Sequence, residues 1–406
     1  MTEISPDAQR LLAVLATRAH TLDMLTDADW ERLVALALEH DVAAVLYARL
    51  KEAGLTFPPA VAKRLRDAYL ASAARNVRLF HELGKILRAL QAASIAVIPL
   101  KGACLAEAVY GNVALRPMAD VDLLVKSGDV AGALDVLRVL GYAPEAPLDP
   151  VAEQTINHGV PMIRPGAVRV DLHWTVLTPR YHGGFGSEDL ELLWSRAEPA
   201  TIGGVPVLMC SPTDLLLHLC LHVSVGHRFG TGLLSYLDIA EVSRRYSDAI
   251  DWEQFSARAN TWGIANGVRL ALQLAGEWTG LVIPPHVLPS LNADPPDDAT
   301  VDWVRHKAFE GTSLALQGDA VRFAGKTRLV DNVGLMRDAM APFLASLAGI
   351  YRSPAASWRS LRAYSGRLTG YLGRHRQVLW RIVRRDKTFL ADARKEARLR
   401  EYLGWR

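Results

Sequence analysis

Cysteine is scarce in this 406-residue chain, which has three: Cys104, Cys210 and Cys220. So few, and an odd number, exclude a disulfide framework and favour a reducing, cytoplasmic setting. Long hydrophobic runs are also missing, and the best one, LLLHLCLHVSVG from Leu215, is short and carries two histidines. A membrane helix needs about 20 apolar residues, so we expect no transmembrane segment. The opening MTEISPDAQR has no basic stretch and no following apolar run, and we expect no secretory signal.

Charge is balanced overall but unevenly placed along the chain. Half of the residues are hydrophobic and 22% are charged, which excludes a disordered or collagen-like protein. From Tyr351 to Arg406 there are 15 Lys and Arg against 4 Asp and Glu, while the rest of the chain holds 31 against 39. This basic tail either contacts a polyanion, such as nucleic acid or a lipid surface, or packs on the acidic body of the chain. Both interpretations stay open.

The spacing of apolar residues predicts helices at both ends and a mixed block between them. Helical periodicity covers 6–19, an amphipathic segment from Trp30 to Gly54, and a long helix over 59–93. From Ser94 the pattern changes to short β-rich runs separated by helices, and it ends in a hairpin whose strands are GVPMI and VRVDLHWTVL. After Ser187 the chain is again mostly helical, apart from a hairpin at TIGGVPVLMC.

We therefore predict an α+β fold with a small mixed sheet between helical regions. The predicted parts are an N-terminal helical region, a core of strands and helices, a helical domain, a proline-rich linker and a basic helical C-terminal region, at 1–94, 95–185, 186–283, 284–300 and 301–406.

Three aspartates on two predicted strands are the strongest chemical signal. Asp120 and Asp122 are alternate residues of one strand, so their carboxylates lie on one face about 7 Å apart. If the later strand that contains Asp171 is adjacent, the three form a cluster suited to Mg²⁺ and a nucleoside triphosphate. Upstream, Lys101-Gly102 joins a strand to a helix, where glycine admits a phosphate and the lysine adds positive charge. Alone, the Asp-Val-Asp pair is also consistent with two solvated carboxylates at a strand edge.

The run LKGACLAEAVYGNVALRPMADVDLLV, with VDLHW fifty residues on, resembles the polymerase-β-like nucleotidyltransferase superfamily. It looks most like the bacterial group described as uncharacterised nucleotidyltransferases. The resemblance implies a nucleotidyltransferase core over about 95–185, followed by helices that help to bind the acceptor. It also implies that Asp120, Asp122 and Asp171 are catalytic and hold the metal. The glycine motif corresponds to Lys101-Gly102.

Several other residues have two interpretations. Arg116 can neutralise triphosphate charge or form a salt bridge with nearby acids. His173 shares the strand face of Asp171 and can orient a metal ligand, contact the acceptor, or be a half-buried histidine bound to backbone. His218 and His222 lie one helical turn apart without the glutamate of a zinc motif, so they form either a polar stripe facing the nucleotide or part of a packed helix.

Two more residues follow on the next helices. Arg228 is expected near phosphate if the histidine stripe faces the nucleotide. Asp238 can act as a base for the acceptor hydroxyl or form a salt bridge between helices.

We expect a cytoplasmic, Mg²⁺-dependent nucleotidyltransferase that moves a nucleoside monophosphate from an NTP to an unidentified hydroxyl or phosphate acceptor. The acceptor is a small molecule, a peptide, a protein or tRNA. The alternative is a catalytically silent nucleotide- or nucleic-acid-binding scaffold that uses the basic C-terminal helices. It is favoured by Ala103, which stands where the superfamily usually has Ser or Gly after the glycine.

Overall fold

The computed structural model describes residues 4–16, 25–145, 154, 157–177, 184–309 and 386–404. Its contacts divide the chain into two compact units, residues 1–296 with 403–406, and residues 297–402. The boundary falls inside the predicted linker at 284–300. The first unit holds the N-terminal helices, the sheet and the helices that follow it, and their division into separate domains stays a prediction.

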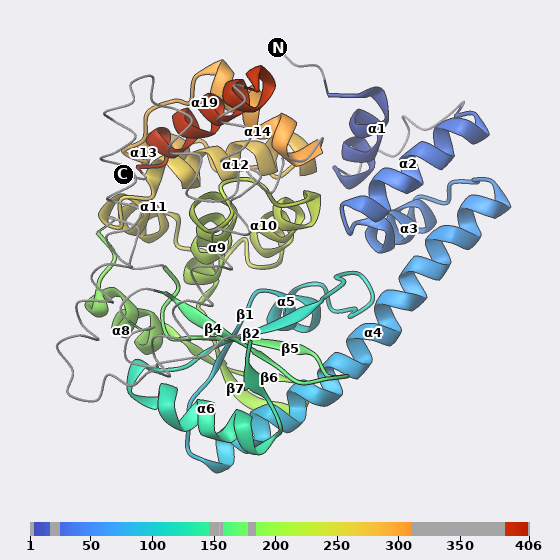
Figure 1. Cartoon of the computed structure of the whole chain (residues 1–406). Helices are drawn as coiled ribbons and strands as arrows, with labels where there is room; N and C mark the ends of the chain where they lie inside the picture. The colour runs from blue at the N-terminus through green and yellow to red at the C-terminus, as the bar shows by residue number, and fades with distance from the viewer. Residues whose placement is uncertain are drawn as a thin grey trace. The chain divides into compact units, whose positions relative to one another are not determined.

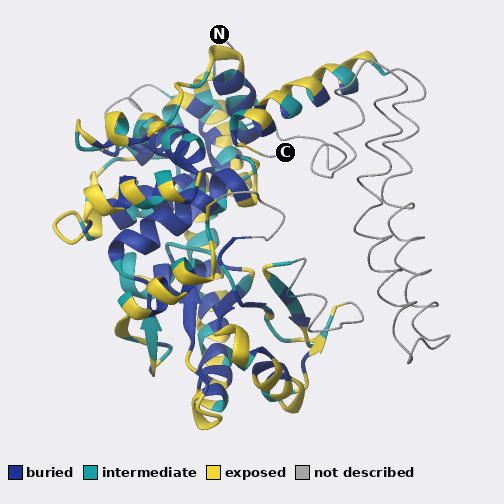
Figure 2. Ribbon diagram, turned by 90° about the vertical axis from the view of Figure 1, so that its left-hand side faces the viewer, coloured by how far each residue is buried: buried dark blue, intermediate teal, exposed yellow. Residues whose placement is uncertain are grey.

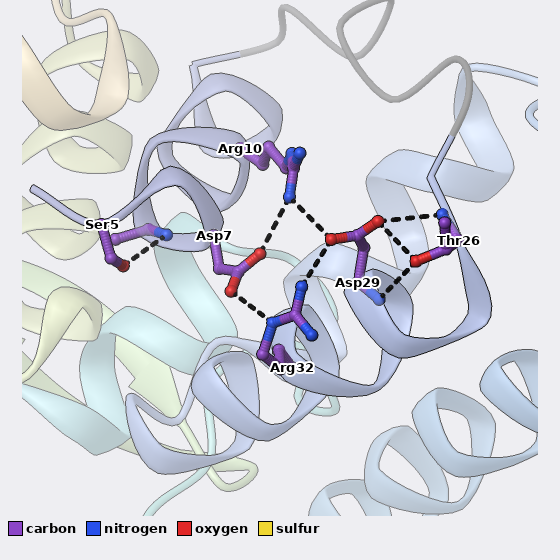
Figure 3. Close-up of polar contacts among 7 residues, drawn as sticks. Ser5, Asp7, Arg10, Thr26, Asp29 and Arg32 are labelled. Carbon is purple, nitrogen blue, oxygen red and sulfur yellow. Dashed lines mark hydrogen bonds and ion pairs between the residues drawn. The ribbon is translucent and has the colours of Figure 1, made fainter.

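The N-terminal helices are joined by a network of ion pairs. α1 (Pro6–Leu15) begins after Ser5, and α2 (Asp27–Glu39) begins at a capping box in which Thr26 and Asp29 bond each other's backbone N–H. Arg10 and Arg32 each bridge Asp7 of α1 to Asp29 of α2, as Figure 3 shows. The network fixes the two helices together along their exposed edges.

The expected single helix from Trp30 to Gly54 is wrong. The structure has two helices there, α2 and α3 (Ala43–Glu52), separated by Asp41 at φ 58°. The Val42 N–H bonds back to the Ala37 carbonyl at 2.9 Å, which closes the end of α2. The long helix α4 (Pro59–Ala92) is as predicted, and it runs from α2 and α3 to α6 and the edge of the sheet region (Figure 1).

The central sheet has five strands within the described residues, in the order β1-β2-β5-β4-β3. The strands are β1 (Ile98–Leu100), β2 (Asp120–Leu124), β5 (Arg169–His173), β4 (Gly159–Ile163) and β3 (Ala143–Pro144). Only the β2–β5 pair is parallel among them. The mixed sheet and its flanking helices confirm the predicted α+β class.

Short helices connect the strands. α5 (Gly102–Cys104) continues as the π-helical turn η2 (Leu105–Val109), and the 3₁₀ turn η3 (Ser127–Asp129) leads into α6 (Val130–Val139). β6 (Glu198–Ile202) and β7 (Val205–Met209) form the predicted second hairpin, which packs beside β1. The strands of the central sheet are largely buried, whereas outer helices such as α2, α4 and α6 expose one face to solvent (Figure 2).

A group of helices completes the first unit: α8 (Ser187–Arg196), α9 (Pro212–Leu221) with its π-helical extension η4 (His222–Gly226), α10 (Leu233–Arg245), α11 (Trp252–Thr261) and α12 (Ala265–Thr279). The predicted Ser-Pro-Thr-Asp cap is present, since the Ser211 hydroxyl accepts a hydrogen bond from the Asp214 N–H. α9 is buried along its whole length and contacts α10, α11 and α12. It is the central helix of this group.

The predicted linker contains the short helix α13 (Val287–Ser290) and the start of α14 (Asp298–Phe309). In the second unit α14 packs on α19 (Lys387–Tyr402) through a buried ion pair between Lys307 and Glu396 at 2.7 Å. The first part of the basic tail, 351–385, lies outside the described residues. Within the part of the chain that is described, no helix has the length and apolar character to cross a membrane.

Candidate active site

The register of β2 and β5 places the three predicted aspartates together. Asp122 lies directly opposite Asp171, and Asp120 lies opposite Arg169. Because alternate side chains of a strand share a face, the three carboxylates occupy one face of two adjacent parallel strands. The adjacency on which the three-carboxylate prediction depends is therefore present.

Asp122 is the buried member of the three, with 6% exposure. Its Oδ1 lies 2.8 Å from Lys101 Nζ and 2.9 Å from His173 Nε2. Burial opposes ionisation of this carboxyl, but the Lys101 ammonium and the His173 hydrogen bond outweigh it and hold the pKa of Asp122 well below its usual range. Asp122 is thus ionised at neutral pH and fixed by two partners.

The carboxylates of Asp120 and Asp171 are half-buried, and they differ in how far a basic side chain neutralises their charge. Burial and repulsion from Asp122 raise the pKa of Asp120. Asp171 is paired with its strand neighbour, since Arg169 Nε donates to Asp171 Oδ1 at 2.9 Å. Asp120 is therefore the position where negative charge is least compensated.

The turn between β1 and α5 brings Lys101 to Asp122. Lys101 has φ 46° and ψ −117°, a backbone conformation that residues other than glycine rarely adopt. Gly102 follows, and a Cβ at this position would lie 2.8 Å from Arg116 Nη1 and 3.1 Å from Met118 Sδ. The glycine is thus required by close packing from the chain that precedes β2.

Arg116 and Asp238 both form a salt bridge, which was one of the two interpretations of each residue. The partner of Arg116 is the distant Asp238 and not one of the acids near it in the sequence. The Arg116 guanidinium forms a bidentate ion pair with Asp238 of α10, with a closest distance of 2.8 Å. Tyr110 also donates to Asp238, at 2.9 Å. The structure places these groups in a salt bridge beneath the Lys101–Gly102 turn.

The sequence predicted only part of the group of histidines around Lys101. His158 stacks on His173 with ring centroids 5.2 Å apart, and His222 and His227 meet at 4.4 Å. Burial, followed by the positive charge of Lys101, lowers the pKa of His218 to about 3. At neutral pH His218 is therefore an uncharged imidazole in the field of Lys101.

The sequence signals for this group were the i, i+4 spacing of His218 and His222 and the position of His173 on the strand face of Asp171, but the stacking of His158 on His173 was not predicted. Both ring nitrogens of His218 are buried without a hydrogen-bond partner in the structure. Arg228 lies in the following turn at φ 47°. Burial, followed by the charges of Lys101 and then Arg228, lowers the pKa of the neighbouring His227 to about 4. The predicted contact of Arg228 with phosphate stays a prediction.

The residues present suit a hard divalent cation. Carboxylate oxygens are the ligands that Mg²⁺ prefers, and three of them share one face here. The raised pKa of Asp120 shows negative charge that a cation would compensate. Among the described residues, no three His, Cys, Asp or Glu side chains are already arranged around a point that a metal can occupy.

The chain was compared with protein families, curated sequences and solved structures. No curated protein sequence matches the chain. The antibiotic-resistance factor ANT(2'')-Ia, whose solution structure is known, aligns at 15% identity over 41% of this chain and 82% of its own, with a TM-score of 0.30. A family model described as "Uncharacterised nucleotidyltransferase" matches residues 26–280, which include both strands of the carboxylate site. The chain therefore belongs to the family of uncharacterised nucleotidyltransferases.

Proposed function

We propose that this protein transfers a nucleoside monophosphate from an NTP to a hydroxyl or phosphate acceptor, and that the reaction depends on Mg²⁺. The observation that carries the proposal is the register of Asp122 opposite Asp171, with Asp120 on the same face. Membership of a nucleotidyltransferase family supports nucleotidyl transfer in general. The acceptor is a small molecule, a peptide, a protein or tRNA.

Asp120, Asp122 and Asp171 are the residues that would hold the metal. A bound Mg²⁺ would neutralise triphosphate charge and lower the pKa of the attacking hydroxyl. In the absence of the cation, Lys101 and Arg169 compensate two of the carboxylates. Each of these two basic side chains is then available to the phosphates once its carboxylate has another partner.

The remaining residues act by position. His173 holds Asp122 through Nε2, which fixes the orientation of that carboxylate. Gly102 leaves the turn without a side chain, which makes room for the Arg116 guanidinium and Met118 to pack against it. The protein contribution is then orientation and charge compensation, which can supply a large part of the rate enhancement of phosphoryl transfer.

Label transfer tests the proposal. The protein is incubated with each α-labelled NTP, Mg²⁺ and a cell lysate, and labelled products and released pyrophosphate are measured. Wild type is compared with Asp122→Ala and with a control, Asp135→Ala, which removes an exposed aspartate paired only with Arg138 of its own helix. We expect Mg²⁺-dependent transfer by wild type and by the control, and loss of most transfer in Asp122→Ala. Equal transfer by Asp122→Ala and wild type would contradict the assignment.

A further inference from the structure

A buried ion pair lies directly against the Lys101–Gly102 turn. Arg116 Nε and Nη2 lie 3.0 and 2.8 Å from the two carboxylate oxygens of Asp238, and the Tyr110 hydroxyl donates to the same carboxylate at 2.9 Å. Asp238 is 2% exposed. A bidentate pair of this kind fixes the plane of the guanidinium as well as its position.

The backbone of Arg116 is fixed independently. Asn76 of α4 donates its side-chain amide to the Arg116 carbonyl at 2.7 Å, and it also bonds the Val113 carbonyl. Asn76 is itself completely buried. Arg116 is therefore anchored at its main chain by α4 and at its guanidinium by α10, which packs on η2 just beyond the turn.

The third nitrogen of the guanidinium is the one that reaches the turn. Arg116 Nη1 lies 2.8 Å from where a Cβ on Gly102 would be, so the guanidinium occupies the space over this glycine. The neighbouring Lys101 is held at φ 46° and ψ −117°. A residue other than glycine keeps such a conformation only where its surroundings hold it there. The Arg116 guanidinium is one such neighbour.

We infer that Arg116 is a positioning residue, which Asp238 and Tyr110 hold in place so that the Lys101–Gly102 turn presents the Lys101 ammonium to the carboxylates. The inference rests on the proposed function for its catalytic consequence. It assigns Arg116 a role through the turn rather than through contact with the nucleotide, and it makes α10 part of the machinery that shapes the site.

A second ion pair on the same helix provides a matched control. Glu241, also on α10, pairs with Arg49 of α3 at 2.7 Å, and its side chain is 25% exposed. This pair ties α10 to another helix without touching the turn. If the Arg116–Asp238 pair only stabilises the fold, Asp238→Asn and Glu241→Gln should differ in stability alone.

The first experiment reads Lys101 directly. Lysines are dimethylated with ¹³C, and the Lys101 resonance is assigned by its absence in Lys101→Arg. We expect Asp238→Asn and Arg116→Lys to shift this resonance. The lysine of Arg116→Lys keeps the positive charge but cannot form the bidentate pair with Asp238. Glu241→Gln should leave it in place. An unchanged Lys101 resonance in folded Asp238→Asn would overturn the inference.

The second experiment measures the dissociation constant for NTP with Mg²⁺, beside the melting temperature. Loss of an outer partner that orients a binding group typically weakens binding about 10–100-fold, and we expect about tenfold for Asp238→Asn and Arg116→Lys. Tyr110→Phe removes one hydrogen bond to Asp238 and should weaken binding less. It replaces Asp238→Asn in the test if that variant does not fold. Glu241→Gln should bind NTP like wild type. If wild type binds NTP, equal affinities across all four variants would also overturn the inference.

The two experiments separate this inference from the proposed function. If wild type binds no NTP but the Lys101 resonance shifts in Asp238→Asn and not in Glu241→Gln, then the proposed function fails and the positioning role stands. If wild type binds and transfers nucleotide while Asp238→Asn keeps both the resonance and the affinity of wild type, the positioning role fails alone.

Discussion

Asp122 and Asp171 lie side by side, in register on the adjacent parallel strands β2 and β5. Each already has a basic partner, Lys101 for the first and Arg169 for the second. Asp120 shares their face, and its pKa is raised by burial and by repulsion from Asp122. The three positions therefore respond differently to substitution.

Replacement of Asp120 by asparagine should separate activity from stability. Burial and the like charge of Asp122 raise the pKa of Asp120, so the neutral amide of Asp120→Asn relieves both penalties. We expect nucleotide transfer to fall at least about 100-fold if Asp120 is a metal ligand, with a melting temperature equal to or above that of wild type. Transfer assays and thermal unfolding at pH 7 give the comparison. Retained transfer would remove Asp120 from the metal site.

Asp122 should make stability depend on pH in the acid range. Its folded-state pKa lies below the value of an unfolded chain, about 3.9, so the stability it contributes is complete above that value. That contribution is lost as the pH falls through the unfolded value toward the folded one. We expect the melting temperature of wild type to drop more steeply than that of Asp122→Asn between pH 5 and pH 3. This range extends about one pH unit to either side of the pKa of an unfolded aspartate. Parallel curves for the two proteins would contradict the assigned ion pair.

His173 should affect metal affinity more than folding. Its Nε2 hydrogen bond fixes Asp122, and loss of such an orienting partner typically lowers metal affinity about 10–100-fold. In His173→Gln, which retains a hydrogen-bonding side chain, we expect a smaller loss than in His173→Ala. The Mg²⁺ concentration for half-maximal transfer measures the effect. The same half-maximal concentration in all three proteins would show that His173 does not orient a metal ligand.

The sequence was sufficient to predict the strands that carry the site. Asp120 and Asp122 alternate with apolar Val121 and Leu123, and this period of two specifies one buried and one polar face. Asp171 has apolar neighbours of the same kind, Val170 and Leu172, which indicated a second strand, but its parallel pairing with β2 was not predicted. Local patterns of this kind depend on residues close together in the chain.

Contacts between distant parts of the chain were not predictable. Arg116 and Asp238 are separated by 122 residues, and each has a plausible local or ligand-binding alternative in the sequence alone. Lys101 adopts a positive φ without being glycine, so no turn signal marks it. The break of the first amphipathic segment at Asp41 was missed for the same reason, since aspartate at this position gives no clear stop.

The most direct test of the central claim is NTP binding with and without Mg²⁺, measured by calorimetry for wild type and Asp171→Asn, with Asp135→Asn as the control. If the three aspartates hold the cation that binds the triphosphate, wild type and the control should bind NTP at least about tenfold more tightly with Mg²⁺ than with EDTA, a coupling of about 1.4 kcal/mol. Asp171→Asn should lose that dependence. Equal NTP affinity with and without Mg²⁺ in wild type, or an undiminished Mg²⁺ effect in Asp171→Asn, would contradict the account.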